Sequence, residues 1–345
     1  MRSERHRWDP VCYPPSGLVR PVPVDPTGRR GPTPAQAQGP KWRTSSRGLF
    51  VPAWVDAEVP EQRILEQSMR LTGGAVTGWA SCRMHGAAFF DGLRRDGRTP
   101  LPVPLNCGPL HQIRRRPGDD LIRDHLVDDE IVIVCDVPCT VDDRATFDAM
   151  RFARDVREAV VALDMMAAAR RTSPRRMQDY VDRHPAWTGV QQVRDAIVLA
   201  DDGSRSPQET RFRLVWQLDA GLPRPLVNRP VFDLRGRLLG YPDLLDPVAG
   251  IVGEYDGADH RGASQHSSDV DREAGFRDHE LEVVRVTGPD LRDVSRVTDR
   301  IQSSYRRAKH VPPERRTWTL HPPPWWTREA TLDEILVARD LRTAS

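Results

Sequence analysis

Three carboxylates, Asp243, Glu254 and Asp256, flank a predicted turn. The segments 238–245 and 250–255 are apolar enough for buried strands, and the Pro and Gly residues between them favour a hairpin. In such a hairpin Asp243 is opposite Glu254, with Cβ atoms roughly 4.5 to 5.5 Å apart, and Asp256 points to the same face. The pattern predicts a site for Mg²⁺ or Mn²⁺, because a hard cation takes oxygen ligands and offsets the repulsion between carboxylates.

Four further side chains are candidates to complete this site. Glu209 can ligate the metal, although its place in the capping-box sequence that begins at Ser206 explains it equally well. His260 follows the third predicted strand, where it is either a general base with a neutral imidazole or an ordinary loop histidine. Arg272 and Arg285 can each hold phosphate oxygens through paired hydrogen bonds, or form surface salt bridges with neighbouring acids.

Composition limits the classes of partner. The chain has 345 residues, of which 38% are hydrophobic, and a formal net charge of +2. Its length predicts about two domains. So small a net charge produces no strong electrostatic field over the whole molecule that would attract nucleic acid. Any basic surface that binds DNA must therefore be local. The only lysines are Lys41 and Lys309, which excludes a mechanism that needs a catalytic lysine beside the three carboxylates.

Sequence features also bear on location. No stretch has the length and hydrophobicity of a transmembrane helix, and the N-terminus has charges without the apolar run of a signal peptide. The five cysteines are scattered and odd in number, which fits reduced thiols better than a disulfide framework. Together these features predict a cytoplasmic location and no membrane partner.

The pattern of apolar residues predicts an α+β fold in four parts. Residues 1–45, crowded with Pro, Gly, Arg and Ser, are expected to be disordered or extended. Residues 46–200 are predicted to form a small α/β region followed by a bridge of helices, and residues 206–310 a domain with the element order αβββαβ. Residues 311–345 are a tail rich in Trp and Pro with a short helix.

The tail contains Trp318, Trp325 and Trp326 among prolines. Tryptophans in such a setting generally fix a tail to the surface of a domain. Alternatively, their rings can stack on the bases of a single-stranded nucleic acid. Both interpretations stay open from the sequence.

The segment 206–308 resembles the PD-(D/E)XK nuclease superfamily, with Glu209 on the first helix, Asp243 on the second strand and Glu254-Tyr-Asp256 on the third. The resemblance implies a restriction-endonuclease-like fold in which two acids hold Mg²⁺ and a DNA phosphodiester bond is hydrolysed. Members commonly carry a lysine two positions after the second acid. This chain has Asp256 there, so the general base stays open.

A narrower similarity rests on Glu254-Tyr-Asp-Gly257 followed by His260, on Asp271-Arg272 and on Val284-Arg285. These residues resemble a branch of the superfamily related to very-short-patch mismatch repair endonucleases, in which Asp often replaces the lysine. The resemblance implies DNA as the substrate, and a repair protein is a further candidate partner.

The first half resembles, less specifically, the AbiEi-type antitoxin family. The matching residues include Gly78-Trp-Ala-Ser81 and Thr146-Phe-Asp148-Ala-Met-Arg151. In that family an upstream winged helix-turn-helix binds operator DNA. Here the Pro-rich leader occupies that place, and only Arg47-Gly-Leu-Phe-Val51 resembles a wing. The resemblance implies DNA or a toxin as partner.

Two functions follow from these patterns. The first is a metal-dependent endonuclease that hydrolyses DNA phosphodiester bonds. The alternative is a non-catalytic DNA-binding regulator or antitoxin-like protein, in which the acids are a relic of a nuclease fold. Metal-dependent cleavage that is lost on Asp243→Ala would distinguish the first from the second.

Overall fold

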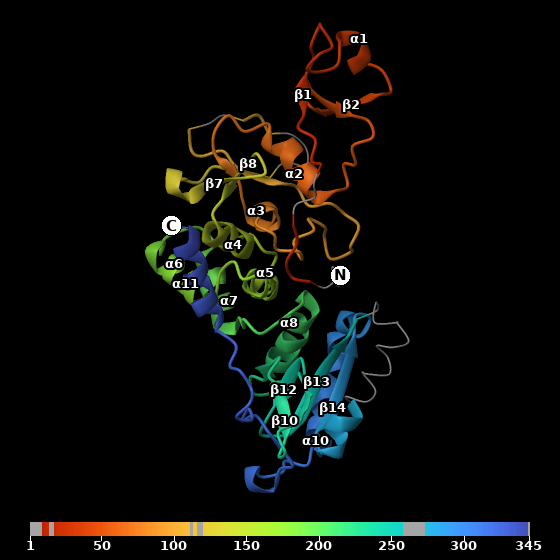
Figure 1. Ribbon diagram of the computed structural model, residues 1–345, viewed down its shortest axis with the longest axis vertical. Coiled ribbons are helices and arrows are strands. Elements are labelled where there is room, and N and C mark those ends of the chain that lie inside the picture. The colour runs from red at the N-terminus through yellow and green to blue at the C-terminus, as the bar shows by residue number, and fades with distance from the viewer. Residues whose placement is uncertain (1–8, 14–16, 111–112, 116–119, 258–272, 344–345) are drawn as a thin grey trace. The chain divides into compact units, whose positions relative to one another are not determined.

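Two compact units, 1–197 and 198–345, make up the chain. The computed structural model describes residues 9–13, 17–110, 113–115, 120–257 and 273–343. Both units combine helices with small sheets (Figure 1), so the predicted α+β class is confirmed. None of the helices in the described ranges is long and apolar enough to cross a bilayer, and all five cysteines are free thiols.

The first unit begins with a three-stranded sheet in the order β1-β3-β2. Strands β1 (Val22–Pro23) and β2 (Trp42–Ser46) both pair antiparallel with β3 (Leu49–Pro52). Between β1 and β2 the short helix α1 (Pro34–Ala37) begins with a capping box between Thr33 and Gln36. Residues 17–45 of the leader, expected to be disordered or extended, thus form extended strands and a short capped helix despite their few apolar side chains.

The larger sheet of the first unit has five strands in the order β6-β5-β4-β8-β7. These strands are β4 (Ala75–Val76), β5 (Pro104–Asn106), β6 (Asp120–Ile122), β7 (Ile131–Val134) and β8 (Val137–Thr140). The helices are α2 (Pro60–Ser68), α3 (Gly78–Met84), α4 (Asp142–Arg151), α5 (Val156–Ala168), α6 (Pro174–Arg183) and α7 (Val190–Leu199), with the 3₁₀ turn η1 (Asp128–Glu130). Apolar side chains of α2 and α3, such as Ile64 and Met84, are buried against the sheet.

The main sheet of the second unit has four strands in the order β14-β13-β12-β9. Its neighbouring strands β12, β13 and β14 are labelled in Figure 1. Strands β9 (Leu226–Val227), β12 (Leu244–Asp246) and β13 (Ile251–Asp256) are antiparallel neighbours, and β14 (Glu282–Thr287) pairs parallel with β13. A smaller sheet consists of β10 (Val231–Asp233), β11 (Leu238–Gly240) and β15 (Trp318–Thr319).

The apolar runs 226–232 and 238–245 are each divided between these two sheets. The first is interrupted at Asn228, whose φ of 48° lies in the left-handed region, and at Pro230. The second is interrupted at Pro242. Because proline lacks the amide donor that a central strand needs, each apolar run changes sheet at that point.

The helices of the second unit complete its framework. They are α8 (Pro207–Leu214), continued by the π-helical turn η2 (Val215–Asp219), then residues 273–278, the 3₁₀ turns η3 (Asp290–Arg292) and η4 (Pro313–Arg315), α10 (Val294–Arg307) and α11 (Leu332–Thr343). Ser206 caps α8 by accepting a hydrogen bond from the Glu209 amide at 3.2 Å. Around the main sheet the element order is the predicted αβββαβ.

Apolar residues cover both faces of the main sheet. Ile251 packs with Phe212 of α8 and Ile301 of α10 on one face. Its neighbour Val252 packs with Phe276 on the opposite face, as the alternation of side chains along a strand requires. Residues with the parity of Val252 therefore face away from α8 and α10.

Candidate functional site

Strands β12 and β13 bring two of the predicted metal ligands into opposition. In their antiparallel register Leu244 is opposite Gly253 and Asp246 is opposite Ile251. One further step along this register places Asp243 opposite Glu254, which is the arrangement predicted from the turn. We call Asp243, Glu254 and Asp256 the acidic strand end.

Strand β14 adds a basic residue to the same region. Arg285 is the parallel neighbour of Glu254, and Thr287 is the neighbour of Asp256. Glu254, Asp256 and Arg285 share the sheet face of Val252, away from α8. Glu254 is 7% exposed, whereas the side chains of Asp256 and Arg285 are 42% and 33% exposed. The acidic strand end therefore runs from a buried carboxylate to a solvent-accessible one.

The three carboxylates were expected from the sequence to converge on one point, but they do not. Asp243 lies just beyond the last ladder pair, and its Oδ2 accepts a hydrogen bond from the Tyr255 amide at 2.6 Å. One oxygen of Asp243 thus takes the place of a backbone acceptor for the Tyr255 amide. Asp256 Oδ2 lies 3.7 Å from Arg285 Nη1. Within the described part of the chain, no three His, Cys, Asp or Glu side chains gather closely enough to hold a metal ion.

Arg285 forms a bridge between two elements at this site. Its Nη2 lies 2.6 Å from Glu273 Oε2, in the helical segment 273–278, while Nη1 faces Asp256. Glu282, at the start of the same strand, pairs with Arg307 instead. Arg285 is thus held beside the acidic strand end by two acids.

Glu209 lies near the acidic strand end but makes structural contacts there. Its Oε2 accepts hydrogen bonds from the Arg205 amide and from Asn228 Nδ2, each at 2.9 Å. The amide of Asn228 in turn donates to the Asp243 carbonyl oxygen at 3.2 Å. Glu209 therefore fixes the start of α8 to the start of β12, which favours its capping role over a ligand role. The other two candidates, His260 and Arg272, lie outside the described residues.

Sequence reasoning missed Asn228 and Glu273. Asn228 carried a signal, since asparagine adopts the left-handed conformation more readily than most residues and it precedes Arg229-Pro230. Glu273 carried none, because its contact with Arg285 depends on how β14 pairs with β13 after the intervening segment.

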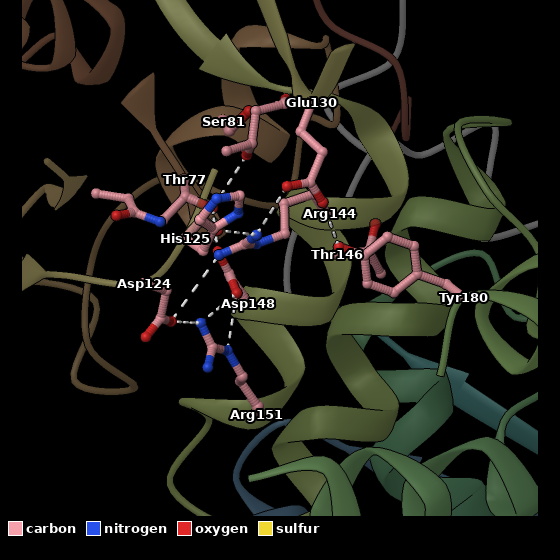
Figure 2. Close-up of polar contacts among 12 residues, drawn as sticks. Thr77, Ser81, Asp124, His125, Glu130, Arg144, Thr146, Asp148, Arg151 and Tyr180 are labelled. Carbon is pink, nitrogen blue, oxygen red and sulfur yellow. Dashed lines mark hydrogen bonds and ion pairs between the residues drawn. The ribbon is translucent and has the colours of Figure 1, made fainter. Parts of the chain in front are cut away.

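A second polar cluster lies inside the first unit, around α4 (Figure 2). Arg144 and Asp148 are fully buried, and Arg144 Nε lies 3.0 Å from Asp148 Oδ2. Arg151 Nε donates to Asp148 Oδ1 at 2.8 Å, and the Thr77 hydroxyl donates to Asp148 Oδ2 at 2.5 Å. The Asp148 carboxylate is therefore surrounded by two guanidinium groups and a hydroxyl.

The same cluster extends to α6 and η1 through Glu130. Arg144 Nη1 donates to Glu130 Oε2 at 3.1 Å, and the Tyr180 hydroxyl donates to Glu130 Oε1 at 2.7 Å. Burial, together with this hydrogen bond to Glu130, raises the pKa of Tyr180, so its phenol remains a donor. The Trp187 ring centroid lies 4.2 Å from the Arg144 guanidinium carbon. These contacts join α4, α6 and η1 into one framework.

The α4 cluster uses its charges internally. The Asp148 carboxylate contacts two arginines and a hydroxyl. A buried charge needs such partners, because they offset the free-energy cost of removing it from water. From the sequence, Asp148 and Arg151 indicated only a family resemblance. The spacing of Arg144, Asp148 and Arg151 on one helix face was the available signal for a buried ion-pair network.

No protein-family model matches the chain, and no curated protein or solved structure matches it either. Function must therefore be inferred from the residues and contacts of the two units.

Proposed function

We propose that the second unit is a nuclease that uses Mg²⁺ or Mn²⁺ to hydrolyse DNA phosphodiester bonds, of the PD-(D/E)XK type that its sequence resembles. The observation that carries the proposal is the register that sets Asp243 opposite Glu254 at the end of a buried hairpin. Directly opposed like charges destabilise a strand pair by a few tenths to about 1 kcal/mol. A divalent cation would remove this penalty, and an oxygen-only donor set suits Mg²⁺.

In this proposal Asp243 and Glu254 hold the ion. A carboxylate has several lone-pair sites, so an Asp243 oxygen that accepts from the Tyr255 amide can also ligate a cation. A bound divalent ion would lower the pKa of a water molecule and neutralise charge that develops on the phosphate. Arg285, one-third exposed beside these acids, would hold a phosphate oxygen, and Asp256 would orient the attacking water.

A second candidate function is a non-catalytic DNA-binding regulator or antitoxin-like protein. Two contacts favour it: Asp243 bonds the Tyr255 amide, and Asp256 faces Arg285. Both acids then have internal partners that stabilise the fold without a metal. Under this proposal the acidic strand end is structural, and DNA or a toxin is the partner.

Cleavage of supercoiled plasmid tests the first proposal. The whole protein should nick the plasmid with Mg²⁺ or Mn²⁺, and Asp243→Asn or Glu254→Gln should each lower the rate by more than about 100-fold. Loss of a group that only orients a ligand already costs roughly 10- to 100-fold. Asp299→Asn, which changes an exposed acid on α10, is the matched control and should keep full activity.

The opposite outcome would favour the regulator. In that case the wild-type protein leaves plasmid intact with either metal, yet retards a particular DNA fragment in the presence of chelator. Equal nicking by the wild-type protein and Asp243→Asn would also reject the proposed site.

A further inference from the structure

The fold uses the tail tryptophans in different ways. Trp318 lies in β15, pairs with Asp233 of β10 and is 5% exposed in the apolar cluster beneath the sheet. It therefore fixes the tail to the second unit. Trp325 is 65% exposed, so its ring adds little to that attachment.

Trp325 is the outer member of a row of aromatic rings. Its centroid lies 5.8 Å from that of Trp326, and the Trp326 centroid lies 6.4 Å from Tyr241. Trp326 is held from below by Phe232, at 4.9 Å in an edge-to-face arrangement. The guanidinium carbon of Arg205 lies 5.5 Å from the Tyr241 ring centroid. We call Trp325, Trp326 and Tyr241 the aromatic row.

The aromatic row ends beside the acidic strand end. Tyr241 precedes Asp243 by two residues. The Arg205 amide donates to Glu209 Oε2, which also accepts from Asn228 Nδ2, and the backbone amide of Asn228 donates to the Asp243 carbonyl oxygen. The row thus connects an exposed ring with the residues proposed to act on a phosphodiester.

Arginines flank the exposed end of the row. A Cβ atom at Gly236 would lie 3.8 Å from Trp325 Nε1, so the turn between β10 and β11 is next to this ring. Arg235 and Arg237 of the turn are exposed. Arg237 Nε lies 3.2 Å from Oδ2 of Asp233, the last residue of β10, and the Arg237 side chain remains 74% exposed. An aromatic face beside exposed guanidinium groups complements a polyanion whose bases are accessible.

We propose that Trp325 stacks on an unpaired base of single-stranded DNA, with the aromatic row leading that strand to Asp243 and Arg235 and Arg237 contacting its phosphates. The inference rests on the proposed function and specifies its substrate class. Bases in a duplex are stacked on their neighbours, so their faces are not available to Trp325. A single strand offers a free face to the ring and a flexible backbone to the arginines.

Binding of a fluorescently labelled oligothymidylate to the whole protein, with chelator present to prevent cleavage, tests the inference by anisotropy. Trp325→Ala should weaken binding at least about fivefold, the smallest loss expected when one base–aromatic stack is removed. Trp325→Phe keeps a ring and should restore most of the affinity. Trp54→Ala, which removes a 76%-exposed tryptophan of the first unit, is the matched control and should bind like wild type.

A stacking readout separates a ring contact from a general loss of structure. The fluorescence of 2-aminopurine in an oligonucleotide should be quenched when the oligonucleotide binds the wild-type protein or Trp325→Phe. It should not be quenched when the oligonucleotide is bound to Trp325→Ala. Arg235→Ala should weaken binding and make it less dependent on salt, since one phosphate contact is removed. The inference is wrong if Trp325→Ala binds like wild type, if it loses as much affinity for duplex as for single strands, or if the wild-type protein binds no single strand.

Failure of this inference is distinguishable from failure of the nuclease proposal. Asp243→Asn should retain single-strand binding in chelator while losing metal-dependent cleavage. Binding that depends on Trp325 without any cleavage would reject the nuclease and keep the stacking surface. Metal-dependent cleavage by the wild-type protein, together with unchanged binding by Trp325→Ala, would keep the nuclease and reject the stacking surface.

Discussion

Asp290 shows how strongly a single carboxylate can be held in the second unit. Its Oδ2 accepts from the Thr287 amide at 3.0 Å and the Thr287 hydroxyl at 2.8 Å, and its Oδ1 accepts from Arg300 Nη2 at 3.0 Å. The hydrogen bond from Arg300, reinforced by those from Thr287, holds the pKa of Asp290 well below its usual range. Asp290 thereby joins β14 to α10.

Asp290→Asn should lower the free energy of unfolding by about 1 to 2 kcal/mol near neutral pH, because it weakens charge-assisted hydrogen bonds to a partly exposed arginine. A carboxylate with a depressed pKa stabilises the fold above its unfolded pKa, about 4, and loses that contribution as the pH falls further. The difference from wild type should therefore shrink in acid.

Urea unfolding of both proteins at neutral and acidic pH measures this difference. Asp299→Asn serves as the exposed control and should change stability by less than about 0.5 kcal/mol at either pH. A penalty that stays constant or grows in acid would contradict this account of Asp290.

Some of the candidate site could be predicted from residues alone. The pairing of Asp243 with Glu254 followed from a local turn and the two-residue alternation of strands. The direction of the Asp243 carboxylate could not be predicted in this way. The β12–β13 ladder ends at Leu244, and the Tyr255 amide beyond it donates to the Asp243 side chain. Arg285 was a candidate from sequence, but its partner Glu273 depended on tertiary pairing.

At the scale of elements, the approach of α8 to β13 depends on a residue without a side chain. A Cβ atom at Gly253 would lie 2.9 Å from Phe212 Cε1 and 3.1 Å from Leu244 Cβ. The close contact lets α8 pack directly over the hairpin that carries the acids. It also explains why an apolar strand contains a glycine at this position.

Gly253→Ala should destabilise the second unit by about 1 to 3 kcal/mol, the usual cost of adding a methyl group to a packed core. Gly275→Ala is the matched control, because a Cβ atom there meets no neighbour within 4 Å and the residue lies in a helical segment. Alanine should be neutral or stabilise by up to about 1 kcal/mol at that site. Thermal unfolding checks both variants, and an unchanged Gly253→Ala would show that Phe212 can move aside.

For the strands of the second unit, the sequence predicted their positions but not the sheets to which they belong. Apolar runs located the strands of the second unit, because burial on both faces leaves a clear hydrophobic signal. The runs did not show that β9 and β10, or β11 and β12, belong to different sheets, although Pro230 and Pro242 marked the breaks. In the leader, Pro and Gly content predicted a disordered or extended segment, while the capping box at Thr33 went unnoticed.

At the scale of the whole molecule, each unit has its own apolar core and its own buried polar contacts. The α4 cluster belongs to the first unit and the acidic strand end to the second. A change in one cluster should therefore affect mainly the unit that contains it.

Arg144→Ala should lower the stability of the first unit by about 3 to 5 kcal/mol, because it leaves the buried Asp148 with one charged partner fewer. Differential scanning calorimetry should show the transition of the first unit at a lower temperature and that of the second unchanged. Arg154→Ala, which removes an exposed guanidinium on the same unit, should leave both transitions in place. Equal shifts of both transitions by Arg144→Ala would contradict independent units.

Direct binding of Mn²⁺, followed by the loss of the free-ion signal in electron paramagnetic resonance, tests the central claim that Asp243 and Glu254 hold a divalent cation. The account predicts binding by the wild-type protein and by Asp299→Asn, and its loss in Asp243→Asn and in Glu254→Gln. Equal binding by the wild-type protein and Asp243→Asn, or no binding by any of the four proteins, would contradict it.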